Sequence, residues 1–178
     1  HHIEACICAS SVQSTGGDDD KPYFINTIAG TGTGALKLNV PALEAKFSGV
    51  YGLAQGKNGD LYASIAEKHV VVKFEFDKQE GTWTNVTIIA GTGSQGTGKE
   101  GVVSTQSDLN TPMGLSLIED SSTDEVTAIL IADWGNHRVR ELDMLTHIIR
   151  TIAGKGFGFS GDGGSATAAE ISFPRYVY

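Results

Sequence analysis

The chain has 178 residues, a formal net charge of −8, 40% hydrophobic residues, 23 glycines and only 4 prolines. The negative charge opposes non-specific binding to nucleic acid or to an anionic membrane, and no segment has the ~20 apolar residues of a membrane-spanning helix. Two cysteines are too few for a disulfide framework or a four-ligand zinc site. The composition favours one globular domain of short strands joined by tight turns, with neither nucleic acid nor membrane insertion as a partner.

Residues 1–23 fit none of the repeats described below. We expect them to be a disordered leader or the remnant of a signal peptide, ending in the acidic linker Gly16–Lys21. The triplet Asn85-Val86-Thr87 is an N-glycosylation sequon, which predicts a glycan on Asn85 in a secreted protein. These two features together favour a secreted or extracellular setting.

The first complete group of strands is expected at residues 51–91. Before it, Ile25–Gly30 reads as a strand that lacks the rest of its sheet. In the third strand of the group, Val70, Val72 and Phe74 fall on one face because side chains alternate along a strand. The four strands are expected at residues 50–54, 60–65, 70–76 and 82–90.

A second group of four strands is expected at residues 112–154. Its centre is the apolar run Ile129–Ala132, which the polar turn Asp133–Asn136 closes before the next strand begins. The polar insertion Glu119–Asp124 falls in the loop between its first two strands, where extra residues cost little. Pro174–Tyr178 then begins a further group as a single strand.

The two groups are copies of one repeat. Two markers recur along the chain at intervals of about 62 residues, and a period kept by independent markers indicates a structural repeat. The first marker occurs as Thr27-Ile28-Ala29-Gly30, Ile88-Ile89-Ala90-Gly91 and Thr151-Ile152-Ala153-Gly154. The second occurs as Ala45–Ser48, Ser107–Asn110 and Ala169–Ser172.

The segment Ile131–Arg140 resembles the signature strand pair of the NHL repeat, named for its Asn-His-Leu-like core. The tract Thr151–Pro174 resembles the long-loop version of this repeat in extracellular and teneurin-type NHL propellers, and the resemblance covers residues 24–178. The first copy departs from the pattern, with Lys68-His69-Val70 in place of Asn-His-Arg. The resemblance implies an all-β fold: an incomplete β-propeller of four-stranded antiparallel blades, with two full blades, orphan strands at 25–30 and 174–178, and residues 24–178 as one domain.

Propellers typically have four to eight blades, so two blades are too few to close a ring. Their flanks would be apolar on both sides and would need to be covered. We therefore expect the chain to be part of a larger propeller, completed by remaining blades of the same protein or by self-association through the open blade flanks.

The glycine-rich loops Gly91–Gly96 and Gly156–Gly161 fit the dinucleotide-binding pattern G-x-G-x-x-G. Glu100 follows Lys99 where a phosphate-binding loop would have Ser or Thr, and no helix follows, so we favour turn glycines. Asp162 stands alone where a calcium loop needs several oxygen ligands. The sequence predicts no metal, no cofactor and no catalytic constellation.

Strand direction predicts a binding face. In an antiparallel blade the second and fourth strands end on the same side, which brings the turns after them together with the long loops Thr31–Lys46, Thr92–Asp108 and Lys155–Glu170. Long loops on a rigid scaffold are where recognition usually resides. For Asn136 and its neighbours, hydrogen bonds that fix the hairpin are the alternative to ligand binding. The candidate ligand-binding residues on this face are Trp134, Asn136, Lys68, Asp162 and Phe159.

The leading functional hypothesis is a non-catalytic module that recognises a protein or a glycan through this face. Trp134 is expected to be partly exposed there and to anchor the ligand. Because NHL-like propellers include metal-dependent lyases, the resemblance also allows a fragment of a propeller enzyme, a lyase or hydrolase, whose catalytic residues lie in other blades. RNA binding, known for some NHL propellers, ranks third because the chain is acidic.

Overall fold

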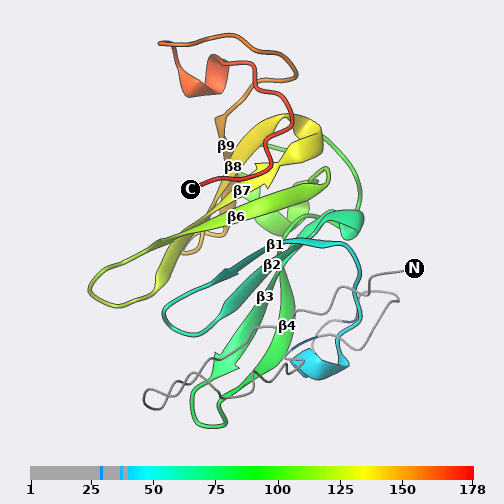
Figure 1. The fold of residues 1–178 in the computed structure, drawn as a ribbon, viewed down its shortest axis with the longest axis vertical. Helices are drawn as coiled ribbons and strands as arrows, with labels where there is room; N and C mark the ends of the chain where they lie inside the picture. The colour runs from blue at the N-terminus through cyan, green and yellow to red at the C-terminus, as the bar shows by residue number, and fades with distance from the viewer. Residues whose placement is uncertain (1–28, 30–36, 38–39) are drawn as a thin grey trace, which may run out of the picture.

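The computed structural model describes residues 29, 37 and 40–178, and these residues form an all-β structure (Figure 1). They make two antiparallel sheets, with strand orders β1-β2-β3-β4 and β5-β9-β8-β7-β6. The helical segments within this part of the chain are 3₁₀ turns of three residues. The all-β class and the four-stranded antiparallel blades expected from the sequence are confirmed, and the two sheets are arranged as neighbouring propeller blades.

The first blade follows the expected succession of strands. Short turns join them, and in the turn before β2 the Gly59 amide donates to the Gly56 carbonyl at 2.9 Å. Gly59 has a φ of +99°, a conformation that side chains with a Cβ rarely adopt. The strands are β1 (Val50–Gln55), β2 (Leu61–Ile65), β3 (Val70–Asp77) and β4 (Thr82–Ala90).

The second blade has the same order of strands and one addition. A two-residue strand, β5 (Val102–Val103), pairs antiparallel with the outermost strand of the blade, although it comes from the long loop that follows the first blade. The repeat pattern did not predict this strand, because its two valines stand alone in a polar loop. The remaining strands are β6 (Pro112–Glu119), β7 (Val126–Asp133), β8 (Arg138–Asp143) and β9 (Ile148–Ala153).

The 3₁₀ turns repeat with the blades. η2 (Ala66–Lys68) follows β2 as η4 (Trp134–Asn136) follows β7, which makes Ala66 the counterpart of Trp134. Each turn ends at a histidine in the left-handed region, His69 with φ 53° and His137 with φ 55°. The three others are η1 (Ala42–Glu44), η3 (Ser104–Gln106) and η5 (Ala166–Ala168).

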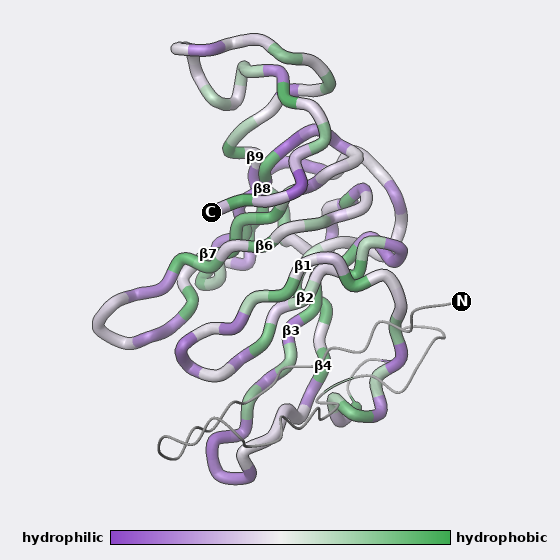
Figure 2. The backbone as a smooth tube through the Cα atoms, viewed as in Figure 1, coloured by the Kyte–Doolittle hydropathy of each residue, from purple (hydrophilic) through white to green (hydrophobic). Residues whose placement is uncertain are grey.

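The two blades pack face to face through an apolar core. Hydrophobic residues follow the strands and hydrophilic residues the hairpin loops (Figure 2). On β3 the alternation is visible directly, since Val71 faces the second blade while Val72 and Phe74 belong to a separate cluster on the far face of the first blade. The core between the blades contains Tyr62, Val71, Ala90, Leu109, Val126, Ile129, Ile131, Leu142 and Ile149.

The innermost strands β1 and β6 lie side by side at the centre of the fan of strands (Figure 1). Their approach requires Gly52, because a Cβ there would lie 2.2 Å from the carbonyl oxygen of Met113. The Gly114 amide in turn donates to the Arg175 carbonyl at 2.9 Å. Residues 174–178 therefore lie beside β6, but they form no strand, unlike the orphan strand expected there from the sequence.

The expected strand at Ile25–Gly30 falls outside the described residues except for Ala29, which is buried among the core residues of the first blade. The expected leader at residues 1–23 also lies outside them. No helix in the part of the chain that the structure describes is long and apolar enough to span a membrane.

Two neighbouring residues on β7 test which face of the second blade is covered. Ile131 is fully buried between the blades, whereas Leu130 points to the opposite face and is only half-buried. Ile131→Ala should lower the free energy of unfolding by about 2–5 kcal/mol, the cost of a buried cavity. Leu130→Ala should cost less than about 1 kcal/mol. Urea denaturation of both variants measures the difference, and equal losses would show that both faces are covered.

Candidate functional site

The long loop after the first blade is tied to the third strand of the second blade. Arg138 and Arg140 project to the same side of β8 because side chains alternate along a strand, and Asn136 precedes them in the 3₁₀ turn η4. Each donates a hydrogen bond to a backbone carbonyl of the loop, so the run Asn-His-Arg-x-Arg acts as a row of donors. The bonds join Asn136 Nδ2 to Gly96 O (2.8 Å), Arg138 Nη1 to Thr97 O (3.4 Å) and Arg140 Nη2 to Lys99 O (2.8 Å).

Glu100 fastens the same loop to the outer strand β9. Its carboxylate accepts hydrogen bonds from the Thr151 backbone amide at 2.7 Å and from the Thr151 hydroxyl at 2.6 Å. It also lies 3.4 Å from Arg140 and 3.7 Å from Arg138. Partial burial pushes the pKa of Glu100 upward, but the bonds from Thr151 and the two guanidinium charges outweigh it and hold the pKa below its usual value.

Asp133 and Arg140 form a fully buried ionic pair at the centre of this network. The Asp133 carboxylate accepts bonds from the Asn110 amide and from Asn136 Nδ2, each at 2.8 Å, and lies 3.9 Å from Arg140 Nη1. Burial raises the pKa of Asp133 to about 6 against these stabilising contacts. Among the described residues, Nε and Nη1 of Arg140 make no hydrogen bond, which leaves part of the guanidinium unsatisfied.

The first blade carries an apolar pair where the second has this ionic one. Ile65 and Val72 stand at the positions of Asp133 and Arg140, and both are fully buried. The same backbone positions therefore accept either pair. In the second blade the ionic network holds the loop to the blade.

Two histidines join each blade to the next. Nδ1 of His69 accepts a hydrogen bond from the Thr111 amide at 3.1 Å, and Nδ1 of His137 accepts one from the Phe173 amide at 3.2 Å. A ring nitrogen that accepts must be unprotonated. Burial lowers the pKa of His69 and so favours this neutral form. The segment Ile131–Arg140 thus bonds to the loops before and after it, as well as within its own hairpin.

An aromatic cluster lies on the loop side of the second blade. Phe173 contacts Trp134 with ring centres 4.7 Å apart and His137 at 4.5 Å, and Phe157 contacts His137 at 5.2 Å. Phe157 is 66% exposed and Phe173 43% exposed, so the cluster is open to solvent. Trp134 is half-buried, and its indole N–H is buried without a hydrogen-bond partner among the described residues.

The structure brings only some of the predicted ligand-binding residues together. Trp134 belongs to the aromatic cluster, while the Asn136 amide is already bonded to the loop and to Asp133. Lys68 is half-buried on the other blade. Phe159, 93% exposed, and Asp162, also exposed, lie on the long loop beyond the ring contacts of the cluster. Their roles in binding remain predictions.

The sequence reasoning missed Phe157, His137 and Phe173 as cluster members. A signal for two of them was available in the repeat, because Phe157 and Phe173 replace Gln95 and Thr111 of the previous copy. The later copy of the repeat therefore carries two aromatic rings at positions where the earlier copy has none.

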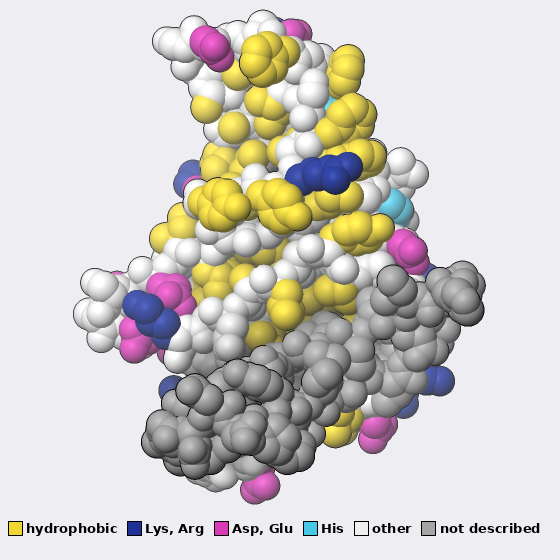
Figure 3. Space-filling model, in the orientation of Figure 1, with side chains coloured by type: hydrophobic (Ala, Val, Ile, Leu, Met, Phe, Trp, Pro, Cys, Tyr) yellow, Lys and Arg dark blue, Asp and Glu magenta, His cyan; other side chains and the backbone are white. Residues whose placement is uncertain are grey.

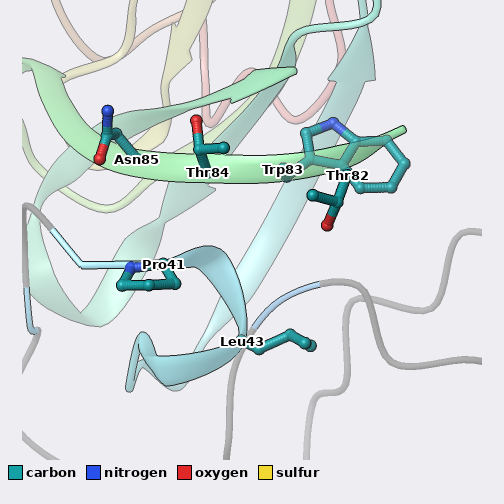
Figure 4. Close-up of a pocket in the computed structure, with 6 residues that line it drawn as sticks. All are labelled: Pro41, Leu43, Thr82, Trp83, Thr84 and Asn85. Carbon is teal, nitrogen blue, oxygen red and sulfur yellow. The ribbon is translucent and has the colours of Figure 1, made fainter. Parts of the chain in front are cut away.

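A shallow groove lies at the outer edge of the first blade, between η1 and β4 (Figure 4). Its volume is about 190 Å³, below the range typical of small-molecule sites. Asn85 lies on its rim, exposed, and donates to the Glu75 carboxylate at 3.2 Å. An exposed sequon asparagine is accessible for glycosylation, which remains a prediction. The other residues that line the groove are Pro41, Leu43, Thr82, Trp83 and Thr84.

No three His, Cys, Asp or Glu side chains come together as metal ligands within the described part of the chain. No protein-family model matches the sequence. No curated protein matches it either.

Solved structures do match the fold. A protein of Bacteroides thetaiotaomicron named an auxiliary nutrient binding protein superposes with a TM-score of 0.63 and 17% identity, over 82% of this chain and 34% of its own. An auxiliary nutrient binding protein of Bacteroides ovatus gives 0.65 and 20%, over 77% and 33%. A candidate phosphatase of Bacteroides thetaiotaomicron gives 0.62 and 18%, over 77% and 31%.

The likeness shows a shared fold. At 17–20% identity, the likeness gives no information on whether this chain shares the activity of these proteins. The chain spans about a third of the length of each of these proteins.

The apolar pair of the first blade suggests a test of the ionic pair. Asp133→Ile and Arg140→Val alone should each lower the free energy of unfolding by about 3–5 kcal/mol, because each removes one partner of a buried charge. The double variant, which copies Ile65 and Val72, should lose clearly less than the sum of the two. Urea denaturation of all four proteins completes the cycle, and strict additivity would show that the pair is not coupled.

The raised pKa of Asp133 gives a pH dependence with a definite sign. Between about pH 4 and pH 6 the folded form holds a proton that the unfolded form has released. This stabilising contribution is complete below pH 4 and is lost as the pH rises through 6. The stability of the wild type relative to Asp133→Asn should therefore fall by about 3 kcal/mol between pH 4 and pH 7. Chemical denaturation at a series of pH values measures it, and a difference that rises with pH would contradict it.

Proposed function

We propose that the chain is part of an NHL-type β-propeller that acts as a non-catalytic binding module for a protein or a glycan. The donor row Asn136, Arg138 and Arg140 supports the family assignment, because it gives the signature a physical task between blades. The names of two structural neighbours, both auxiliary nutrient binding proteins, support a binding role.

The observation that carries the proposal is the exposed aromatic cluster on the loop side of the second blade. Exposed apolar patches with polar rims mark interaction sites in soluble proteins. Phe157 and Phe159 correspond to Gln95 and Thr97, which remain exposed even though their loop is fastened to a blade. The side chains of the second loop therefore stay accessible when the loop's backbone is engaged.

The chemistry of this surface suits ligands with flat apolar faces and polar edges. Aromatic rings supply large contact areas at a low entropic cost, as sugar rings or the apolar side chains of a peptide would require. Asp162 adds an exposed carboxylate on the same loop. In this proposal Trp134 supports the cluster by packing against Phe173.

The proposal places the protein outside the cell, in agreement with the sequon at Asn85. It assigns no part to nucleic acid or membrane insertion. Residues 24–178 would then be one partial propeller domain preceded by a leader at residues 1–23.

One observation favours a second function. The neighbour named as a candidate phosphatase has the same fold, so the chain can be a piece of a propeller hydrolase or lyase with its catalytic residues in other blades. Metal analysis of the full-length protein, with hydrolysis of p-nitrophenyl phosphate, separates the two functions. A bound metal together with turnover would replace the binding proposal.

The binding proposal predicts the effect of removing the exposed rings. Phe157→Ala combined with Phe159→Ala should weaken binding at least about tenfold, because central aromatic contacts dominate such interfaces. The probes are a panel of soluble polysaccharides in affinity gel electrophoresis and an immobilised set of peptides. Both substitutions are at exposed positions, so the free energy of unfolding should change by less than about 1 kcal/mol.

The matched control is Leu145→Ala. Leu145 is 89% exposed, but it lies in the β8–β9 turn, on the side of the blade opposite to the proposed face. It should leave binding unchanged. Equal losses for both variants, or no loss for the aromatic one, would overturn the loop face as the binding surface.

A further inference from the structure

The second long loop, Lys155–Glu170, has the same backbone path as the first, Thr92–Asp108, but it lacks the contacts that attach the first loop to a blade. The Gly154 amide donates to the Ala166 carbonyl at 2.9 Å as Gly91 does to Ser104 at 3.1 Å. Gly158 closes against Glu170 as Gly96 closes against Asp108, since in each case a Cβ would lie 2.5 Å from the carboxylate. The two loops therefore share a backbone path, with Asp162 in the place of Glu100.

What surrounds the two loops differs. In the first loop, the Gly101 amide donates to Ile149 and the Ser104 amide to His147, which adds β5 to the edge of the second blade. In the second loop, residues 161–168 are all exposed. No hydrogen bond or ion pair of Asp162 occurs within the described residues, whereas Glu100 has two arginines and a threonine.

The outward face of the second blade is also uncovered. Tyr62 and Val71 of the first blade are fully buried by the second, but their counterparts Leu130 and Val139 are only half-buried. Ile118 is 43% exposed and Tyr176 is 74% exposed. Figure 3 shows hydrophobic side chains gathered over the upper half of the molecule, around the C-terminal segment.

We propose that residues 155–168 fasten a further blade, the one whose innermost strand is Pro174–Tyr178. The hydrogen bond from the Gly114 amide to the Arg175 carbonyl already places residues 174–178 beside β6, although they form no strand in the structure. The rest of that blade covers Leu130 and Val139, and its outer edge pairs with residues 163–166 as β9 pairs with β5. This inference rests on the proposed propeller but not on the proposed ligand.

The interface between the first long loop and the second blade gives the chemistry expected of the partner, because Asp162 keeps the carboxylate of Glu100. The third strand of the further blade carries amide or guanidinium donors at three alternate positions, which reach the carbonyls of Gly158, Phe159 and Gly161. Gly158 O already accepts from the Ser172 hydroxyl at 2.7 Å and retains a second lone pair. The Asp162 carboxylate accepts a hydrogen bond from a hydroxyl residue on the outermost strand of that blade and forms an ion pair with an arginine on its third strand.

A second copy of this chain fits the site poorly. The described residues contain one such donor row, Asn136 to Arg140, and the chain's own first loop occupies it. The first blade offers Lys68, Val70 and Val72 at these positions, and two valines donate no hydrogen bond to the loop. The length of the structural neighbours, about three times the part they share with this chain, leaves room for further blades in one polypeptide.

Amide hydrogen exchange at Gly163 and Ala166 tests the proposal. Both amides should exchange freely in the 178-residue chain and be protected at least about tenfold in the full-length protein, as Gly101 and Ser104 are by their bonds to Ile149 and His147. Measurement at two protein concentrations identifies the source of any protection. Free exchange in the full-length protein, or protection that depends on concentration and so requires a second copy, would overturn the proposal.

Three substitutions in the full-length protein complete the experiment. Asp162→Asn should reduce the protection of Gly163 and Ala166 by about tenfold, because the carboxylate loses its cationic partner. Glu100→Gln should do the same to Gly101 and Ser104, while the exposed carboxylate variant Asp124→Asn should change neither pair. An Asp162 variant that behaves like Asp124→Asn would show that the carboxylate has no partner in another blade. Ligand binding is measured separately, so its failure would leave this result intact.

Discussion

The junction between the first long loop and the second blade depends on one constraint, the burial of the Arg140 guanidinium. A guanidinium cannot lose its proton in a protein, so burying it without oxygen partners would be prohibitively costly. Asp133 provides one partner from the same blade, and the Lys99 carbonyl and Glu100 provide others from the loop of the preceding blade. Folding the second blade therefore requires the loop of the first, and the two form one structural unit.

Most of the fold could be predicted because its signals are local. Alternating apolar residues mark β3, and the run Ile129–Ala132 with its polar turn marks the β7–β8 hairpin. The period of about 62 residues extends the assignment from one blade to the other. The short strand β5 escaped prediction because it exists only through its pairing with β9, and two valines in a polar loop have no periodicity.

The candidate site was less accessible, because its contacts join segments that lie far apart in the sequence. Asn136 bonds to Gly96 and His137 to the Phe173 amide, across 40 and 36 residues. A sequence pattern shows that the histidine recurs as His69 and His137, but not which backbone group a polar side chain meets. The same limit hid the aromatic cluster: Phe157 and Phe173 read as isolated residues until the repeat copies are aligned by their place in the fold.

The long loop's attachment to the following blade changes what counts as a movable unit of this protein. Cutting the chain at the visible edge of a sheet, between Val103 and Pro112, would separate the second blade from its fifth strand and from the carboxylate of Glu100. The natural cassette is instead a loop plus the blade that follows it, residues 92–154. Shuffling, duplicating or circularly permuting such an array would keep the contacts between each loop and its following blade only if the breaks fall directly after the glycines that end each fourth strand.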